Sequence, residues 1–379
     1  MGCAVKGPGR WGLVHYLPER LPRTLSLDSA TVLALSKADT ALGRLAGAGR
    51  LLPNPHLLVG PYVATEAVAS SRIEGTQASL SEVLEANATG RSVPGSDVLE
   101  VQNYIAAMIT GLDQLRSMPL CLRLIRNVHG VLMTDVRGHE RSPGEFRTTP
   151  NWIGSATDTP QDAAFVPPLP DEMGPLLDDL EQFLNEDAPL PVLVRCALVH
   201  YQFETVHPFL DGNGRLGRLL AVFYLVQQQL LPQPLLYLSA YFEQHRSAYY
   251  DRLQAVRERG ELQEWLQFFL TAVAVQAGDA VTRAERLSDV RERYRRKTAT
   301  SRSRASEVVD LIMTNPYITV RQVQAELGVT QPGALNLIRR LEGLGWLQEL
   351  STRGRGGRTF WVAPEVLSTI SEPTVDSQW

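Results

Sequence analysis

Apolar residues recur at helical spacing through most of the first 280 residues of this chain, and Gly or Pro interrupts them at intervals. The segment DSATVLALSKADTALGRLAGAG has this spacing and ends at glycine, and PYVATEAVASSRIEG opens with Pro61, a residue suited to the start of a helix. Only residues 144–170 break the period, where Phe-x-Thr and Trp-Ile pairs between Gly and Pro indicate a short hairpin and an irregular loop. The pattern predicts a mainly α fold, a helical bundle with a small β-hairpin flap.

The composition indicates a globular protein and not a membrane protein. Of the 379 residues, 44% are hydrophobic and 21% charged, which suffices for two or three domains. The longest apolar stretches, Leu219 to Val226 and Phe268 to Val275, are far shorter than the roughly 18 residues of a membrane span. The start, MGCAVKGPGRWG, lacks the apolar core of a secretory signal, so we expect a cytoplasmic protein. Three scattered cysteines predict neither a disulfide framework nor a zinc site.

The C-terminal part of the chain has a different order of elements. From Ser306 onward the sequence predicts a helix, a short helix, a Gly-Val-Thr turn, a third helix and two strands around a Gly- and Arg-rich loop. This order resembles a winged helix-turn-helix domain. The net charge of −4 gives no global attraction to nucleic acid, so any such binding must come from local patches.

Residues 207–218 read HPFLDGNGRLGR and precede a long apolar run of helical period. The glycines expose main-chain N–H groups at a helix N-terminus, which binds anions because the positive end of the helix dipole lies there too. Arg215 and Arg218 lie one helical turn apart and add positive charge. Asp211 offers a hard oxygen suited to Mg²⁺ beside a phosphate, and His207 can take a proton near neutral pH. These residues together indicate nucleotidyl or phosphoryl transfer.

The same stretch resembles the Fic family signature, His-Pro-Phe-x-Asp/Glu-Gly-Asn-Gly-Arg-x-x-Arg, at every defining position. In that family the histidine activates a hydroxyl of a target protein, which attacks the α-phosphate of ATP and becomes AMP-modified. The resemblance implies a protein adenylyltransferase that uses ATP and Mg²⁺ and modifies a Ser, Thr or Tyr side chain. It implies that His207 is the general base, that Phe209 packs inward and that Asp211 holds the metal ion. It also implies nucleotide contacts from Gly212, Asn213, Gly214, Arg215, Leu216, Gly217 and Arg218.

Two further segments resemble parts of Fic proteins. GEFRTTPNWIG resembles the hairpin that aligns a target segment by strand addition, although Pro150 stands where we would expect a main-chain donor. Tyr249 and Tyr250 resemble the aromatic pair of the adenine pocket, with core packing as the alternative; of the two, we choose Tyr250 as the nucleotide contact. Three other histidines are interpreted as packed core residues: His129, His200 and His245.

The stretch SSRIEG, upstream of the motif, resembles the inhibitory helix of Fic proteins, Ser/Thr-x-x-x-Glu-Gly/Asn. Ser70 and Glu74 are four residues apart and so share a helix face. In the family the glutamate pairs with the last arginine of the signature. The resemblance therefore implies that Glu74 reaches the nucleotide site and holds Arg218 in an autoinhibited enzyme. A helix end followed by Gly75 as a cap is the other interpretation.

The resemblance covers about Leu27 to Ala277, together with the winged helix that some bacterial members carry. It predicts an N-terminal helical region with the inhibitory helix at 1–97, the Fic catalytic core at 98–280, a charged helix fading into a linker at 281–303, the winged helix-turn-helix at 304–366 and a tail at 367–379.

Other functions stay open at this point. The same pocket could serve phosphotransfer or the removal of AMP, and the protein could be a DNA-binding regulator with the Fic domain as a nucleotide sensor. The predicted recognition helix and wing carry the candidate DNA contacts: Gln331, Asn336, Arg339, Arg340, Arg353, Arg355 and Arg358. Winged helices also bind proteins, so a protein partner is the alternative to DNA, and a homodimer is left open as well.

Overall fold

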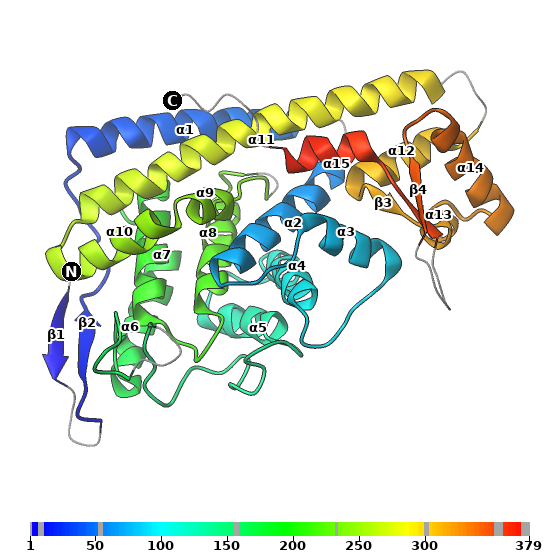
Figure 1. Cartoon of the computed structure of the whole chain (residues 1–379). Coiled ribbons are helices and arrows are strands. Elements are labelled where there is room, and N and C mark those ends of the chain that lie inside the picture. Colours follow the sequence, from blue (N-terminus) through cyan, green and yellow to red (C-terminus); the bar gives the residue numbers. More distant parts are fainter. Residues whose placement is uncertain are drawn as a thin grey trace.

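The computed structural model describes residues 2–6, 11–51, 56–154, 159–231, 234–298, 303–351 and 359–372. Within them the fold is mainly helical with small sheets, which confirms the predicted fold class (Figure 1). The helices before the C-terminal domain are α1 (Ser29–Leu51), α2 (His56–Ile73), α3 (Leu80–Thr89), α4 (Asp97–Gln114), α5 (Leu122–Leu132), α6 (Pro170–Asn185), α7 (Val192–Val206), α8 (Asn213–Gln227), α9 (Ser239–Gln244), α10 (Arg246–Arg259) and α11 (Leu262–Thr298). No helix in the described ranges is long and apolar enough to cross a membrane.

Helices α7 and α8 form the centre of the bundle. Every residue of α7 from Leu193 to Val206 is buried, and α8 is buried without a break from Arg215 to Leu225. A helix that is buried on all sides has its position set by neighbours in every direction. The loop that joins these two helices carries the motif, so both of its ends are fixed by the core.

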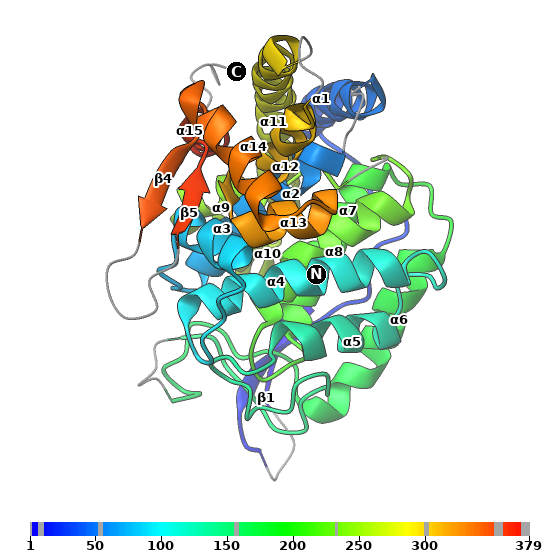
Figure 2. The same cartoon turned by 90° about the vertical axis from the view of Figure 1, so that its right-hand side faces the viewer.

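The long helix α11 lies beside α1 along one side of the molecule (Figures 1 and 2). It runs unbroken to Thr298, so most of the segment at 281–303, predicted as a charged helix that fades into a linker, is helical. The reason is an apolar stripe at helical spacing, Ala284, Leu287 and Tyr294, which is buried while most of the charged residues are exposed. Tyr294 stacks on Trp346 of the C-terminal domain, with ring centroids 4.0 Å apart.

The C-terminal domain has the predicted order of helix, short helix, turn, helix and two strands. Its elements are α12 (Ala305–Thr314), β3 (Tyr317–Ile318), α13 (Val320–Leu327), α14 (Gln331–Gly343), β4 (Gln348–Ser351), β5 (Thr359–Val362) and α15 (Pro364–Ser371). The strands form an antiparallel sheet in the order β3-β5-β4. Strand β3 and helix α15 have no counterpart in the sequence prediction.

This domain packs directly on α2, which carries the start of the SSRIEG stretch, and on α3, which follows it. Helix α12 lies against α2, and β3 lies against α3 (Figure 1). The Asn315 side chain donates to the Leu84 carbonyl at 2.9 Å. Apolar side chains from both partners form one small cluster: Ala64, Leu84, Ala88, Tyr317, Phe360 and Val362.

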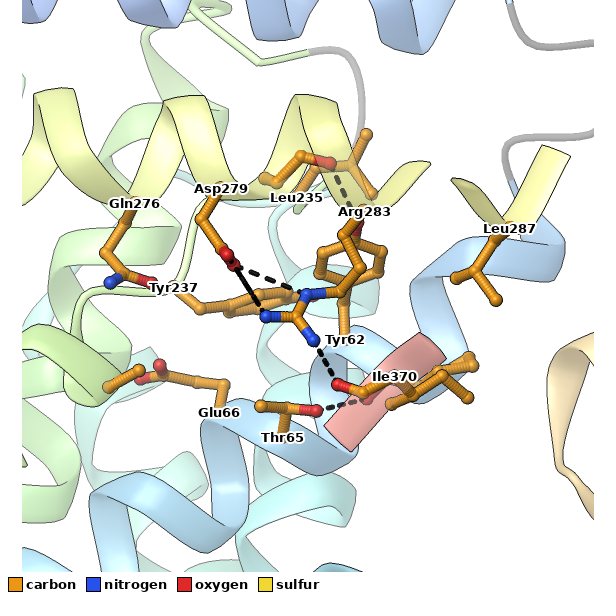
Figure 3. A pocket seen from close by; sticks show the side chains of 13 residues that line it. Tyr62, Thr65, Glu66, Leu235, Tyr237, Gln276, Asp279, Arg283, Leu287 and Ile370 are labelled. Carbon is orange, nitrogen blue, oxygen red and sulfur yellow. Dashed lines mark hydrogen bonds and ion pairs between the residues drawn. The ribbon is translucent and has the colours of Figure 1, made fainter. Parts of the chain in front are cut away.

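Helices α2, α11 and α15 meet around a small cavity (Figure 3). Arg283 of α11 donates to both carboxylate oxygens of Asp279, at 3.1 and 2.9 Å, and to the carbonyls of Ile370 and Glu372 at the end of α15. The last carbonyls of a helix have no partner within the helix, so Arg283 satisfies acceptors that would otherwise be left without one.

Three local differences from the sequence prediction concern the first 170 residues. Strands β1 (Gly2–Lys6) and β2 (Val14–Pro18) form an antiparallel hairpin that the sequence did not indicate. Helix α2 begins at His56, so Pro61 lies inside it and not at its start; the apolar residues before Pro61 extend the helix despite one lost hydrogen bond. In the predicted flap, the described residues hold one antiparallel bridge, between Ile153 and Phe165.

Candidate active site

The motif loop is braced by its own side chains. His207 ends α7 with a left-handed φ of 49°, and α8 begins at Asn213. Asn213 is buried; its Oδ1 accepts from the Phe209 N–H at 2.9 Å and its Nδ2 donates to the Phe209 carbonyl at 2.8 Å. The Asn213 side chain is therefore engaged within the loop, and what this residue can offer a phosphate is its main-chain N–H.

His129 braces the loop from α5. It is buried, as predicted, and it stacks on Phe209 with ring centroids 3.7 Å apart. Its Nε2 lies 3.0 Å from the Asp211 carbonyl, and its Nδ1 accepts from the Gly144 N–H at 2.8 Å. A carbonyl can only accept, so Nε2 carries the proton and the ring is neutral. The inward packing predicted for Phe209 is thus completed by a histidine for which the sequence suggested only a core role.

Arg147 and Asn151 hold the same loop from the flap segment. Arg147 is buried and donates from Nε to the His207 carbonyl at 2.9 Å. Asn151 donates from Nδ2 to the Phe209 carbonyl at 2.9 Å. Neither residue was singled out by the sequence patterns, because each acts on main-chain atoms nearly sixty positions away.

His207 is positioned to act as a base. Its Nδ1 lies 3.3 Å from the Glu204 carbonyl, so the proton of a neutral ring belongs on Nδ1 and the lone pair on Nε2. Burial lowers the pKa of His207 to about 3, and the positive charges of Arg147 and Arg257 act in the same direction. The imidazole is therefore neutral near pH 7.

Arg215 and Asp211 lie together at the N-terminal turn of α8. Arg215 is buried; its Nη1 is 3.7 Å from Glu100 and its Nη2 is 3.7 Å from Asp211. Among the described residues, its Nε and Nη1 have no hydrogen-bond partner. Buried donors without acceptors are costly, at about 1–3 kcal/mol each, so this site favours an anion.

Asp211 suits one vertex of a magnesium ion. Its side chain is one-third exposed, at 32%, and its Oδ1 accepts from the Gly212 N–H at 2.6 Å. No cluster of three or more His, Cys, Asp or Glu side chains occurs among the described residues. A Mg²⁺ ion held by one carboxylate, water and phosphate oxygens fits this donor set, because Mg²⁺ usually keeps several waters.

Arg218 makes three contacts with the end of α2. Its Nε donates to Ser70 Oγ at 2.8 Å, and its Nη2 donates to the Ser70 carbonyl at 2.9 Å and to Glu74 Oε1 at 2.7 Å. Ser70 thus shares the guanidinium with Glu74, whereas the sequence had suggested only the glutamate as its partner. Burial alone would raise the pKa of Glu74, but the charge of Arg218 and the hydrogen bond to it outweigh this effect and lower that pKa.

The Glu74 carboxylate lies over the first turn of α8. A Cβ added to Gly214 would collide with Glu74 Oε1, so this approach requires glycine. Gly75 follows with a φ of +98°, as a helix-ending glycine would. The structure therefore satisfies both interpretations of the stretch: the helix ends there, and its glutamate meets Arg218.

The two tyrosines differ in exposure. Tyr249 is buried, and its hydroxyl lies 2.8 Å from His200 Nε2, so it belongs to the core. Tyr250 is 40% exposed. Burial of part of its surface raises the pKa of Tyr250 to about 12, and the Glu74 carboxylate adds to this shift. Of the pair, Tyr250 is the one exposed enough to meet a ligand, and the Arg246 guanidinium lies over its ring, 5.9 Å from the centroid.

The other predicted residues divide between core and surface. Leu216 is fully buried in the core, so its side chain packs and does not face the loop. His200 is buried with Nδ1 3.0 Å from the Gly217 carbonyl, as a core histidine should be. His245 is only half-buried and stacks on Tyr241, so the core role predicted for it was wrong.

In the C-terminal domain, four of the candidate DNA contacts lie on α14 and are exposed: Gln331, Asn336, Arg339 and Arg340. The three wing arginines fall outside the described residues: Arg353, Arg355 and Arg358.

Three family models match the chain. The Fic/DOC family N-terminal model matches residues 32–113, the Fic/DOC family model residues 119–225 and the HTH DNA binding domain model residues 306–357. The chain belongs to the Fic/DOC family and carries a helix-turn-helix domain in its C-terminal part.

Its relatives include proteins named protein adenylyltransferase Fic. The one from Culex quinquefasciatus is 30% identical over 207 residues, which is 52% of this chain and 37% of the relative. The one from Drosophila willistoni is 26% identical over 263 residues, 68% of this chain and 46% of the relative. The chain thus spans less than half the length of these relatives. A crystal structure of a Fic family protein from Desulfovibrio desulfuricans G20 shares the fold, with a TM-score of 0.57 and 21% identity over 94% of this chain and 99% of that one.

Proposed function

We propose that this protein transfers AMP from ATP to a hydroxyl side chain of a target protein. The observation that carries the proposal is the pair of unsatisfied Arg215 donors at the N-terminal turn of α8, in the same motif as a neutral His207. An anion at the helix N-terminus would satisfy these donors and face the helix dipole. The matching family and the names of the relatives support the same chemistry.

In the proposed reaction, the hydroxyl oxygen of the target attacks the α-phosphorus of ATP. His207 Nε2 takes the hydroxyl proton, the bond from the α-phosphorus to the bridging oxygen breaks, and pyrophosphate leaves. The main-chain N–H groups of Gly212, Asn213 and Gly214, together with Arg215 and Arg218, would bind the phosphates. Mg²⁺ held by Asp211 would neutralise phosphate charge. Tyr250 would stack on the adenine.

We propose further that Glu74 keeps the enzyme inactive. Ser70 and Glu74 occupy the Nε and Nη2 donors of Arg218, so these donors are not available to the γ-phosphate of ATP. The Glu74 carboxylate also brings negative charge close to Gly214, where the phosphate chain should pass. Release requires the Glu74 side chain to turn away, which its 32% exposure permits.

Phosphotransfer and removal of AMP would use the same residues, so the reaction must be identified by its product. The test incubates the Glu74→Gly protein with ATP, Mg²⁺ and cell lysate and measures the mass added to modified proteins. Addition of AMP supports the proposal. Addition of a phosphate alone, or release of AMP from a premodified target with no addition, would replace it with the corresponding alternative.

A second function, DNA binding by the C-terminal domain, is favoured by the matching HTH model and by the four exposed polar side chains of α14. Arginines there would contact phosphates, and Gln331 or Asn336 would contact bases. Affinity for duplex DNA should then fall steeply with salt. Absence of binding, or binding that does not depend on salt, would favour a protein partner instead.

A further inference from the structure

Glu204 is a buried acidic residue of α7, next to the motif, and one oxygen of its carboxylate is unsatisfied. The residue is 6% exposed, and its Oε1 has no hydrogen-bond partner within the described ranges. The main-chain carbonyl of Glu204 does have partners: it accepts from Arg257 at 3.2 Å and lies 3.3 Å from His207 Nδ1. An orphaned buried acceptor beside a reaction centre calls for a donor that the free protein does not supply.

Helix α8 leaves room for the Glu204 carboxylate because position 217 is a glycine. A Cβ at Gly217 would collide with Glu204 Oε1 and would lie 3.2 Å from the Glu204 Cδ. Any other residue at position 217 would push the carboxylate out of its place. Gly217 lies one helical turn after Gly214, so Glu204 is next to the first turns of α8, beyond the phosphate-binding loop.

The charges and rings around Glu204 belong to the proposed nucleotide site. Its negative charge raises the pKa of both Tyr249 and Tyr250, and the positive charge of Arg218 opposes the effect of burial on its own pKa. Burial raises the pKa of Glu204 to about 7. The Glu204 carboxylate is therefore close enough to interact electrostatically with Arg218, the arginine proposed for the phosphate chain, and with Tyr250, the ring proposed for adenine.

We propose that Glu204 accepts a hydrogen bond from the nucleoside part of the nucleotide and so determines which nucleotide is used. The inference rests on the proposed function, since it takes the phosphates to lie at the N-terminus of α8. A nucleoside offers two kinds of donor, the ribose hydroxyls and an amino group of the base, and a carboxylate accepts from either. A site built to bind a donor discriminates strongly against an analogue without it, because the buried acceptor is then left unpaired.

The test compares equilibrium affinities for ATP and three analogues, each lacking one donor: 2′-deoxy-ATP, 3′-deoxy-ATP and the triphosphate of purine riboside. In the Glu74→Gly protein with Mg²⁺, we expect at least one analogue to bind roughly 10-fold or more weakly than ATP. The additional substitution Glu204→Ala should bring the ratio of the dissociation constant of that analogue to the dissociation constant of ATP close to one. The analogue affected then identifies the donor.

The matched control is Glu66→Gln in the same background. Glu66 is also a buried glutamate, but its carboxylate already accepts from Tyr104 at 3.1 Å and from the Ser239 N–H at 3.0 Å. This variant should keep the discrimination. Should Glu204→Ala fail to fold, Glu204→Gln keeps the volume and removes the charge, and the ratio should still shrink about threefold or more.

Ratios that are the same with and without Glu204, in protein that binds ATP, would overturn this inference and leave the proposed function standing. Failure of the Glu74→Gly protein to bind ATP at all would overturn the proposed function and this inference together.

Discussion

Two buried arginines, Arg218 and Arg283, each tie parts of the chain together, and they do so with different partners. Arg283 pairs with Asp279 on its own helix and donates to main-chain carbonyls at the end of α15 (Figure 3). Arg218 donates instead to Ser70 and to the Glu74 side chain, at the end of α2. The same kind of guanidinium hydrogen bond therefore joins α11 to main-chain atoms in one case and α8 mainly to side-chain atoms in the other.

The difference lies in what each partner can do when the contact breaks. The carbonyls at the end of α15 are main-chain atoms and move only with the helix. The Glu74 side chain is 32% exposed and can turn into water, at a cost of about 3–5 kcal/mol because the buried Arg218 charge then loses its carboxylate. A ligand that needs Arg218 can supply that free energy. We infer that Arg283 makes a structural contact and Arg218 a releasable one.

The largest expected effect lies on the Arg218 side of the comparison, at the reaction centre. In the Glu74→Gly background, His207→Ala should slow AMP transfer roughly 10²- to 10⁴-fold and leave ATP binding nearly unchanged, because only proton transfer is lost. Single-turnover transfer of labelled AMP measures this. His245→Ala, at a half-buried histidine outside the motif, is the control and should keep the rate. Transfer at an undiminished rate in the His207 variant would remove that residue from the mechanism.

Replacing Arg218 itself should give the next largest effect. Arg218→Ala abolishes the pair with Glu74 but also deletes a phosphate ligand, so activity should stay low. In the Glu74→Gly background the same change should reduce transfer by about 10²- to 10³-fold, the usual range for losing one charged stabiliser. If Arg218→Ala alone were active, the phosphate-binding arginine would have to be another residue of the motif.

Arg283→Ala should lower the stability of the protein and leave AMP transfer nearly unchanged, the reverse of the effect expected for Arg218→Ala. It removes the ion pair with Asp279 and the hydrogen bonds to the last carbonyls of α15, so the free energy of unfolding should fall by about 2–3 kcal/mol, measured by urea denaturation. AMP transfer by the Glu74→Gly protein should change less than twofold. A gain in transfer by Arg283→Ala in the wild-type background would mean that Arg283 also restrains the enzyme, and the contrast between the two arginines would fail.

The smallest effect concerns an arginine that is exposed. Arg339 lies on the outer face of α14, so it should act on a partner and not on the fold. If the domain binds DNA, Arg339→Ala should flatten the slope of log affinity against log salt by about one unit, with no change in unfolding free energy. Fluorescence anisotropy over a salt series measures the slope. An unchanged slope, in protein that binds DNA, would exclude Arg339 from the phosphate contacts.

Features that repeat along the sequence could be predicted, and features that depend on distant contacts could not. The helices of the core and the winged helix-turn-helix follow from apolar spacing, and the motif residues follow one another within a single loop. The hydrogen bond from Arg147 to the His207 carbonyl joins residues 60 positions apart, and nothing local to Arg147 indicates it. The sequence predicted a charged helix in this part of α11 but not how far it runs, because its dense charge conceals an apolar stripe.

The site shows the same division. Sequence reasoning placed Glu74 opposite Arg218, because the resemblance supplied the long-range pairing. It did not find that Ser70 contributes two of the three contacts to that arginine, nor that the Asn213 side chain is used within the loop. It also overlooked Glu204, whose importance appears only when the partners of buried atoms are counted.

The most direct test of the account compares AMP transfer by the wild-type protein and by Glu74→Gly. Both are incubated with labelled ATP and Mg²⁺ at matched concentration, and label on the target or on the enzyme itself is measured. The account predicts a rise of about tenfold or more in the variant, because the carboxylate that holds Arg218 is gone and no bulk is added. Equal transfer by the two proteins would contradict it, since Arg218 would then be available to ATP with Glu74 in place.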